Sequence, residues 1–233
     1  MKLSSATTEG REDLEEDLPR DRAQWEHGSV VSYPARSPLF GDNRYRGNCD
    51  GRLFLNLVLH YRPKRVADPM MGSGTTKDVI SWLNEGRPDE EKIDYWGGDL
   101  KDGFDLRCQS IPGEFDLVFI HPPYWNIIRY SDSPQDLSTV SSFDEFVEAL
   151  RECLQRCSQA LAPGGRLAVL LGDVRRKGSY FPIVREVMNM EGELGELRSV
   201  LIKVQHNCSS DIRSYRLEDV PIRHEYCVVF KKK

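Results

Sequence analysis

The sequence predicts a doubly wound α/β domain whose sheet has seven strands, is mostly parallel and ends in an antiparallel edge hairpin. From about residue 50 onward, short apolar runs alternate with stretches of helical period, which is the pattern of a parallel sheet with helices on both faces. The last two apolar runs are joined by about twenty polar residues without helical period, so they can pair as antiparallel strands at one edge. With 233 residues, 39% of them hydrophobic, the chain is expected to form one domain.

The expected elements follow in order along the chain. Residues 1–30 are polar and charged and predict an acidic, disordered tail, so the domain itself is assigned to residues 31–233. An irregular segment over residues 32–48 precedes a short helix that is capped by Asp50. Strands are expected at 65–68, 93–97, 115–120, 167–171, 197–205 and 225–230, and helices at 74–84, from the capping box at 142–145 to the break at 163–165, and near 182–190.

Net charge does not decide whether the chain binds nucleic acid. The formal charge is −5, but residues 1–22 alone hold seven acids and four bases. The other residues hold 28 bases and 30 acids, so a nearly neutral body can still present a basic face to phosphate groups. For the tail itself, a solvated end is favoured over a partner-binding or autoinhibitory arm.

The cysteines indicate a reducing compartment. Six cysteines are scattered without a CxxC pair, and the first residues lack the apolar stretch of a secretory signal, so a cytoplasmic location is expected. Cys153 and Cys157 share the apolar stripe of an expected helix, which predicts buried thiols and no metal site. Because no run of about 18 apolar residues occurs, no membrane span is expected.

A turn with two glycines follows the expected strand 65–68. Residues 68–76 read DPMMGSGTT. Gly72 and Gly74 let the backbone turn sharply and approach a ligand, and the amides that open the next helix favour a carboxylate or phosphate. The lysine of a P-loop does not follow the second glycine, which argues against binding of a nucleoside triphosphate.

Two acids near the next expected strand suit a nucleoside. Asp99 at the strand end can accept hydrogen bonds from ribose hydroxyls, and Asp105 from an adenine amino group. NAD and S-adenosylmethionine both carry such groups. The alternative for each acid is a turn or cap residue.

A second turn, which reads HPPYW at residues 121–125, follows the expected strand 115–120. Loops at the carboxyl ends of parallel strands form the ligand site of an open sheet, so both turns are expected at one sheet edge. Two prolines remove two backbone donors and leave rigid carbonyl acceptors beside an aromatic ring. This combination suits a planar base with an exocyclic amino group that has been taken out of its stack. A tight exit turn is the alternative interpretation.

With these two motifs, the chain after about residue 40 resembles the amino-group methyltransferases that act on adenine N6 or cytosine N4 in DNA, in a gamma-like motif order. The resemblance implies a Rossmann-like methyltransferase fold and S-adenosyl-L-methionine as the cofactor, with segment 44–50 beside its methionine part. It assigns cofactor binding to Asp68, Met70, Gly72, Gly74, Thr75, Asp99 and Asp105. It assigns catalysis to His121, Pro122, Pro123 and Tyr124, where the family usually has Asp, Asn or Ser at the first position.

The resemblance also implies a mechanism. An aromatic amino nitrogen is a weak nucleophile because its lone pair is delocalised into the ring. If the Pro122 carbonyl and the His121 side chain accept its N–H groups, the lone pair can face the sulfonium methyl group. Tyr124 would stack on the base, and Trp125 would extend that surface. Because only neutral histidine accepts a hydrogen bond, activity is expected to fall below the ordinary histidine pKa of about 6.5.

Further candidates follow the later strands. Residues 172–177 carry Asp173 and Arg175 in a loop suited to nucleic-acid phosphate, with a solvated basic turn as the alternative. His206 and Asn207 are candidates for contact with the target base. A nucleic-acid face is extended by candidate arginines at Arg213, Arg216 and Arg223.

Three functions remain open. A DNA methyltransferase that acts on adenine N6 is favoured over one that acts on cytosine N4. An RNA base methyltransferase would explain why only segments 126–141 and 207–224 remain for target recognition. A non-catalytic, cofactor-binding partner subunit would suit His121 and the acidic tail. Because so few residues remain for target recognition, the chain is expected to read a short site, to form a homodimer or to depend on a partner protein.

Overall fold

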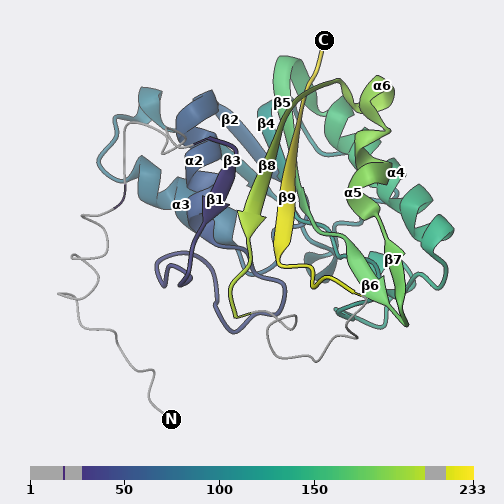
Figure 1. Cartoon of the computed structure of the whole chain (residues 1–233). Helices are drawn as coiled ribbons and strands as arrows, with labels where there is room; N and C mark the ends of the chain where they lie inside the picture. Colours follow the sequence, from purple (N-terminus) through teal and green to yellow (C-terminus); the bar gives the residue numbers. More distant parts are fainter. Residues whose placement is uncertain (1–17, 19–27, 208–218) are drawn as a thin grey trace.

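The computed structural model describes residue 18, residues 28–207 and residues 219–233 of the chain. In these residues a central sheet separates two layers of helices (Figure 1). Most of the expected tail, and the candidates Arg213 and Arg216, lie outside the described residues. None of the helices in the described ranges is long and apolar enough to cross a membrane.

The main sheet has seven strands in the order β1-β8-β9-β5-β4-β2-β3. Neighbouring strands are parallel except β9, which runs antiparallel to both β5 and β8. This arrangement confirms the predicted fold class. The strands are β1 (Val30–Ser32), β2 (Arg65–Asp68), β3 (Asp94–Gly97), β4 (Phe115–Ile120), β5 (Leu161–Leu171), β8 (Glu196–Val204) and β9 (His224–Lys231).

Seven strands were predicted, but residue ranges followed from the pattern for only six of them. Strand β1 is the seventh, and its three residues are too few to establish a period of two. It pairs with β8, and Val30 lies opposite Ile202. In the described part of the chain, the predicted hairpin of β8 and β9 therefore lies one strand in from the edge. After β1 the chain crosses the carboxyl ends of the strands as the irregular segment that the sequence predicts.

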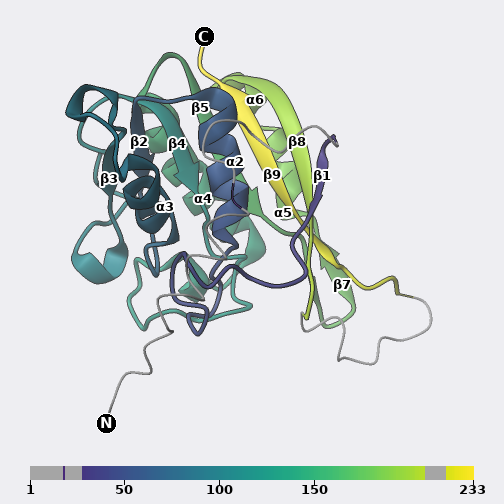
Figure 2. The same ribbon diagram turned by 90° about the vertical axis from the view of Figure 1, so that its left-hand side faces the viewer.

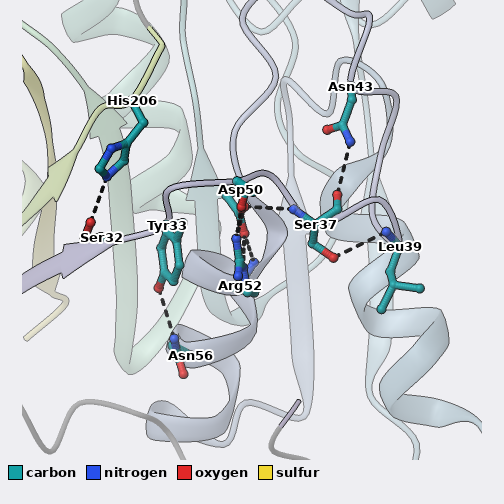
Figure 3. Close-up of polar contacts among 10 residues, drawn as sticks. Ser32, Tyr33, Ser37, Leu39, Asn43, Asp50, Arg52, Asn56 and His206 are labelled. Carbon is teal, nitrogen blue, oxygen red and sulfur yellow. Dashed lines mark hydrogen bonds and ion pairs between the residues drawn. The ribbon is translucent and has the colours of Figure 1, made fainter. Parts of the chain in front are cut away.

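Polar contacts hold this irregular segment onto the body (Figure 3). Asp50 is the N-cap of α2 (Gly51–Tyr61) and accepts hydrogen bonds from the backbone N–H groups of Arg52 and Ser37 at 2.9 and 3.1 Å. Asn56 on the same helix donates to the hydroxyl of Tyr33 at 3.1 Å. The cap that the sequence predicts thus also positions the chain that crosses the sheet edge.

The helices cover both faces of the sheet (Figure 2). One layer consists of α2 and α3 (Thr75–Asn84), and the other of α4 (Phe143–Gln159), α5 (Ile183–Met188) and α6 (Glu191–Leu194). Helix α4 begins with the expected capping box, in which Ser142 accepts from the Glu145 backbone and Glu145 reaches back. The predicted burial of Cys153 and Cys157 on this helix is confirmed.

Strand β5 begins before the glycines that were expected to precede it. A side chain at Gly165 would lie 2.9 Å from the Ala162 carbonyl and 3.0 Å from that of Phe115, so only glycine fits this close approach. The pairing of β5 with β4 is irregular at the same place. The glycines therefore form a bulge inside β5 and do not end the helix, which stops at Gln159.

The chemistry of the site depends on strand order. Strand β2 lies between β3 and β4, so the chain leaves β2 toward one side and later returns to its other side. Such a reversal opens a crevice beyond the carboxyl ends of the strands. The turn after β2 and the turn after β4 therefore meet, as the sequence predicts.

Candidate active site

A cavity of about 390 Å³ lies beyond the carboxyl ends of β2, β3 and β4. Asp68, Asp99 and His121 reach it from these three strand ends, and Tyr45 and Asn48 reach it from the irregular segment. Its volume falls in the range of about 300–1,000 Å³ that is typical of small-molecule sites. Both sequence motifs thus contribute to a single cavity.

The glycine turn has the backbone conformation that glycine favours. Gly72 and Gly74 have φ values of 52° and 87°, and Gly74 is the N-cap of α3. A Cβ atom at Gly72 would lie 3.2 Å from the ring of Tyr45. The positive φ values therefore explain why both positions are glycine. The turn also brings the first residues of α3 to the cavity wall.

Asp68 is buried and fixes the start of this turn. Its carboxylate accepts hydrogen bonds from the Thr76 hydroxyl at 2.6 Å and from the Met70 backbone at 3.1 Å. Burial raises the pKa of Asp68 to about 7, and these two hydrogen bonds oppose the shift. Asp68 and Met70 line the cavity, so they shape its wall while Asp68 also holds the turn.

Asp99 joins the ends of β2 and β3. Its carboxylate accepts from the Gly72 backbone at 2.9 Å and from the Lys101 backbone at 3.1 Å. A carboxylate has about four acceptor positions, so capacity remains for a ligand in the cavity. Asp105 also lines the cavity, and its oxygens accept from the Arg107 backbone at 2.9 Å and from the Cys108 thiol at 3.3 Å. Both acids combine the turn role with the ligand position.

The segment 44–50, which was expected beside the methionine part of the cofactor, lies against the glycine turn. Asn48 is buried, and its side-chain oxygen accepts from the hydroxyls of Ser73 at 3.2 Å and Thr75 at 2.5 Å. The ring of Tyr45, which also lines the cavity, stacks on Tyr130 with centroids 6.2 Å apart. Asn48 was not singled out from the sequence, because its role depends on a contact 25 or more residues away.

The HPPY turn at residues 121–124, which is the candidate catalytic turn, places His121 and Pro123 on the cavity wall. Pro122 is buried beside them. The hydroxyl of Tyr124 lies 2.9 Å from Nε2 of His121 and donates to Oε1 of Glu225, also at 2.9 Å. His121 is therefore bound to the core on one side and open to the cavity on the other.

The pKa expected for His121 from sequence is corrected by the structure. Burial lowers the pKa of His121 from 6.5 to about 4, although the Glu225 carboxylate opposes this shift. Near-neutral pH therefore leaves the imidazole uncharged and able to accept a hydrogen bond. The ordinary histidine pKa is wrong here because it assumes full contact with water.

Glu225 and Lys203 are site residues that the sequence did not reveal. They lie directly opposite each other on β9 and β8 and form an ion pair of 2.6 Å. Both are buried, with 7% and 9% of their surface exposed. Lys203 lies between the apolar Ile202 and Val204, which was an available signal, but charges are also common at strand ends. Glu225 lies between His224 and Tyr226 and offers no such signal.

The comparison with protein families decides the family. The model of the N6/N4 family of DNA methylases matches residues 115–233, which is just over half of the chain. This chain belongs to the N6/N4 DNA methylase family. The match begins at β4 and includes both the catalytic turn and the Lys203–Glu225 pair. No curated protein sequence is significantly similar to the chain.

Several solved methyltransferase structures are similar to this chain. TTHA0409 of Thermus thermophilus, proposed to be a DNA modification methylase and solved with S-adenosyl-L-methionine, is 23% identical, with 55% of this chain and 53% of that chain covered and a TM-score of 0.39. TrmN from Thermus thermophilus is 18% identical, with 81% of this chain and 50% of that chain covered and a TM-score of 0.44. The N-methyltransferase NodS from Bradyrhizobium japonicum is 11% identical, with 77% of this chain and 83% of that chain covered and a TM-score of 0.41. The chain spans about half the length of the first structures that it matches.

Trp125 lies in the core and does not extend the surface of the HPPY turn, contrary to expectation. Only 6% of its surface is exposed, and its indole N–H donates to the Val140 carbonyl at 3.0 Å. Its ring packs against Phe143 and Phe181. A left-handed backbone at Trp125, with φ of 52°, turns the side chain inward, and no sequence pattern indicates this turn.

The expected phosphate loop is a β-hairpin. Strands β6 (Val174–Arg176) and β7 (Ser179–Phe181) are joined by Lys177 and Gly178, both with positive φ. Asp173 accepts from the Tyr180 hydroxyl at 2.6 Å and the Val184 backbone at 2.9 Å, so it holds the hairpin on α5. Arg175 forms a 2.6 Å ion pair with Asp219. The exposed cations of this hairpin are Arg176 and Lys177.

The candidates that follow β8 lie apart from the cavity. His206 is exposed after β8, and its ring lies 2.8 Å from the hydroxyl of Ser32 at the end of β1 (Figure 3). Neither His206 nor Asn207 lines the cavity. In the described ranges, no cluster of three or more His, Cys, Asp or Glu side chains suits a metal ion.

Proposed function

We propose that this chain transfers a methyl group from S-adenosyl-L-methionine to the exocyclic amino group of a base in DNA, with adenine N6 as the target. Membership of the N6/N4 DNA methylase family supports the reaction class. The observation that carries the proposal is the single cavity formed by the glycine turn after β2 and the HPPY turn after β4.

The residues around the cavity fit the proposed cofactor. The cofactor supplies an electrophilic methyl group on a sulfonium sulfur. Asp99 retains acceptor capacity for ribose hydroxyls, and Asp105 faces the same cavity. The open backbone of Gly72 allows close approach of the ligand. Thr75 also lines the cavity, and its hydroxyl bond to Asn48 orders the turn.

The catalytic turn supplies two acceptors for the target amino group. Proline has no N–H, so the carbonyl of Pro122 is held without a neighbouring donor of its own residue. The neutral imidazole of His121 is the second acceptor. Two acceptors orient the two N–H groups and direct the nitrogen lone pair toward the methyl donor. Tyr124 supplies its ring as a stacking surface for the flipped base.

DNA is the proposed substrate, and the β6–β7 hairpin is a proposed contact for its backbone. Exposed Arg176 and Lys177 next to the buried Trp125 suit phosphate groups. Asp173 and Arg175 support the hairpin in this proposal and do not bind phosphate themselves. Recognition of a longer sequence is proposed to need a second copy or a partner protein.

Identification of the modified nucleoside tests the proposal. The full-length protein is incubated with labelled S-adenosyl-L-methionine and with duplex DNA, single-stranded DNA or total RNA, and the nucleosides are then separated by mass spectrometry. We expect N6-methyladenine in DNA. N4-methylcytosine would correct the target base, and label only in RNA would contradict DNA as the substrate. Intact cofactor binding without label in any pool would contradict catalysis.

A further inference from the structure

One hydroxyl group links the catalytic turn to the buried ion pair. The hydroxyl of Tyr124 has a single proton, and an ionised carboxylate only accepts. The 2.9 Å contact with Glu225 therefore uses the Tyr124 proton. The same oxygen lies 2.9 Å from Nε2 of His121. Because the hydroxyl proton already points to Glu225, this second contact is a hydrogen bond only if Nε2 of His121 donates.

Glu225 is held in its ionised form. Burial alone would raise its pKa, but the charge of Lys203 and the hydrogen bonds of its partners keep the pKa below its ordinary value. The Lys203 ammonium lies 2.6 Å from Oε2, so each carboxylate oxygen has its own donor. The direction of the hydrogen bonds from His121 to Tyr124 to Glu225 is therefore fixed.

The opposite ring nitrogen of His121 is left as an acceptor. The charged groups that act on His121 are Glu225, Lys203 and Arg36, and burial outweighs the carboxylate and keeps the ring neutral. A neutral imidazole with its proton on Nε2 has its lone pair on Nδ1. Within the described ranges, no hydrogen bond occupies Nδ1, and His121 lines the cavity.

We propose that Glu225, acting through the Tyr124 hydroxyl, is a positioning residue that fixes the Nε2–H tautomer of His121 and so reserves Nδ1 for the target amino group. This inference rests on the proposed function. In the step, a nitrogen–carbon bond forms and the carbon–sulfur bond breaks, with its electron pair left on sulfur. The target nitrogen loses one proton, which Nδ1 takes. A carboxylate at position 121 would need no such support, since it has no tautomers.

Two variants separate the tautomer from packing. Tyr124→Phe keeps the ring but removes the acceptor of Nε2, so both tautomers become populated. Lys203→Met combined with Glu225→Leu removes both buried charges together, which proteins often tolerate. The Tyr124 hydroxyl then loses its acceptor and donates to Nε2, so the proton of His121 moves to Nδ1. Tyr226→Phe is the matched control, because it removes a hydroxyl bound to His224 at 2.8 Å on the same strand.

Nitrogen NMR of the full-length protein with labelled histidine reads the tautomer without substrate. We expect a protonated Nε2 and a bare Nδ1 for His121 in the parent protein and in Tyr226→Phe. We expect the reverse in the Lys203→Met/Glu225→Leu variant. A proton on Nδ1 in the parent protein, or an unchanged tautomer in the double variant, would overturn the inference. Because no transfer is measured, these outcomes are independent of the proposed function.

Single-turnover transfer to DNA supplies the kinetic arm. We expect Tyr124→Phe to slow transfer by at least about tenfold, and the loss to shrink when His121 is replaced by Asp. An equal loss from Tyr124→Phe in the His121 and His121→Asp backgrounds would show a packing role and overturn the inference. A parent protein that binds cofactor but transfers nothing would contradict the proposed function instead, and the NMR result would still decide the tautomer.

Discussion

His121 occupies the position at which this family usually has a residue that needs no tautomer to accept a hydrogen bond. A histidine can replace it only if the ring is neutral and has its lone pair on the cavity side. Burial provides the first condition, since it lowers the pKa of His121 to about 4. The contact with Tyr124 provides the second. The second condition depends on Glu225, which accepts the Tyr124 proton and is distant in sequence.

The pH dependence of transfer follows from this shift. The folded-state pKa of about 4 lies below the unfolded value, so His121 remains a neutral acceptor as pH falls through 6.5. Because burial also raises the pKa of Asp68 to about 7, the single-turnover rate constant is compared with that of His121→Asp. We predict that the ratio of the two rate constants is flat between about pH 5.5 and 8. Rapid-quench measurements of labelled DNA across this range check the prediction. A midpoint near 6.5 in this ratio would show that His121 is exposed to water or does not act as the acceptor.

The same shift explains why sequence reasoning misjudged this residue. The HPPY motif contains the histidine and two prolines directly after an apolar strand. The turn, its carbonyl acceptors and its position beyond β4 were therefore predictable. The ring's surroundings were not, because Lys203 and Glu225 meet it only when β8 and β9 pair. Trp125 was misplaced for a related reason, since a single left-handed residue turned it into the core.

Among the helices, the N-caps of α4 and α2 differ in what they stabilise. Ser142 caps α4 at an exposed position, whereas the buried carboxylate of Asp50 caps α2 and also holds Arg52 and the Ser37 backbone. We predict that Ser142→Ala lowers the free energy of unfolding by about 1 kcal/mol. Asp50→Ala should cost more, about 2–3 kcal/mol, because buried donors lose their acceptor.

Urea unfolding of both variants measures this difference. Cofactor affinity should stay unchanged in Ser142→Ala, which lies away from the cavity, and should weaken in Asp50→Ala, whose cap orders the segment that carries Asn48. Equal losses of stability in the two variants would show that Asp50 acts as an ordinary cap and does not anchor the irregular segment.

Regular elements were predictable where the period was long enough to see. The capping box that begins α4 and the apolar strand β4 match the sequence prediction, although α4 ends at Gln159, before the break expected at 163–165. Strand β1 has three residues, and β6 and β7 have three each, so their pairing depends on neighbours and on a two-residue turn. Tertiary contacts, and not local pattern, decided these short strands.

At the scale of the whole molecule, the strand order brings the two turns together. The order predicts that one ligand bridges the ends of β2 and β3, and that its binding stabilises the whole domain. At a cofactor concentration of about 100 times the Kd, linkage gives about 2.7 kcal/mol, or a rise in Tm of about 5–10 °C for a chain of this size.

Asp99→Asn should remove most of this thermal shift, because an amide accepts fewer hydrogen bonds from ribose than a carboxylate does. Asp102→Asn, three residues along the same turn and exposed, is the control and should keep the full shift. Differential scanning fluorimetry with S-adenosyl-L-methionine measures both variants. A full shift in Asp99→Asn would place the ribose elsewhere.

The proposed function depends on a hydrogen bond that His121 accepts from the amino group of a base while the cofactor lies against the glycine turn. Single-turnover transfer of labelled methyl from S-adenosyl-L-methionine to duplex DNA, with nucleosides identified by mass spectrometry, tests this most directly. We predict label on an amino nitrogen of the DNA base. In His121→Ala we predict that transfer falls by at least about a hundredfold while cofactor binding is retained. Equal transfer by the parent protein and His121→Ala would contradict it.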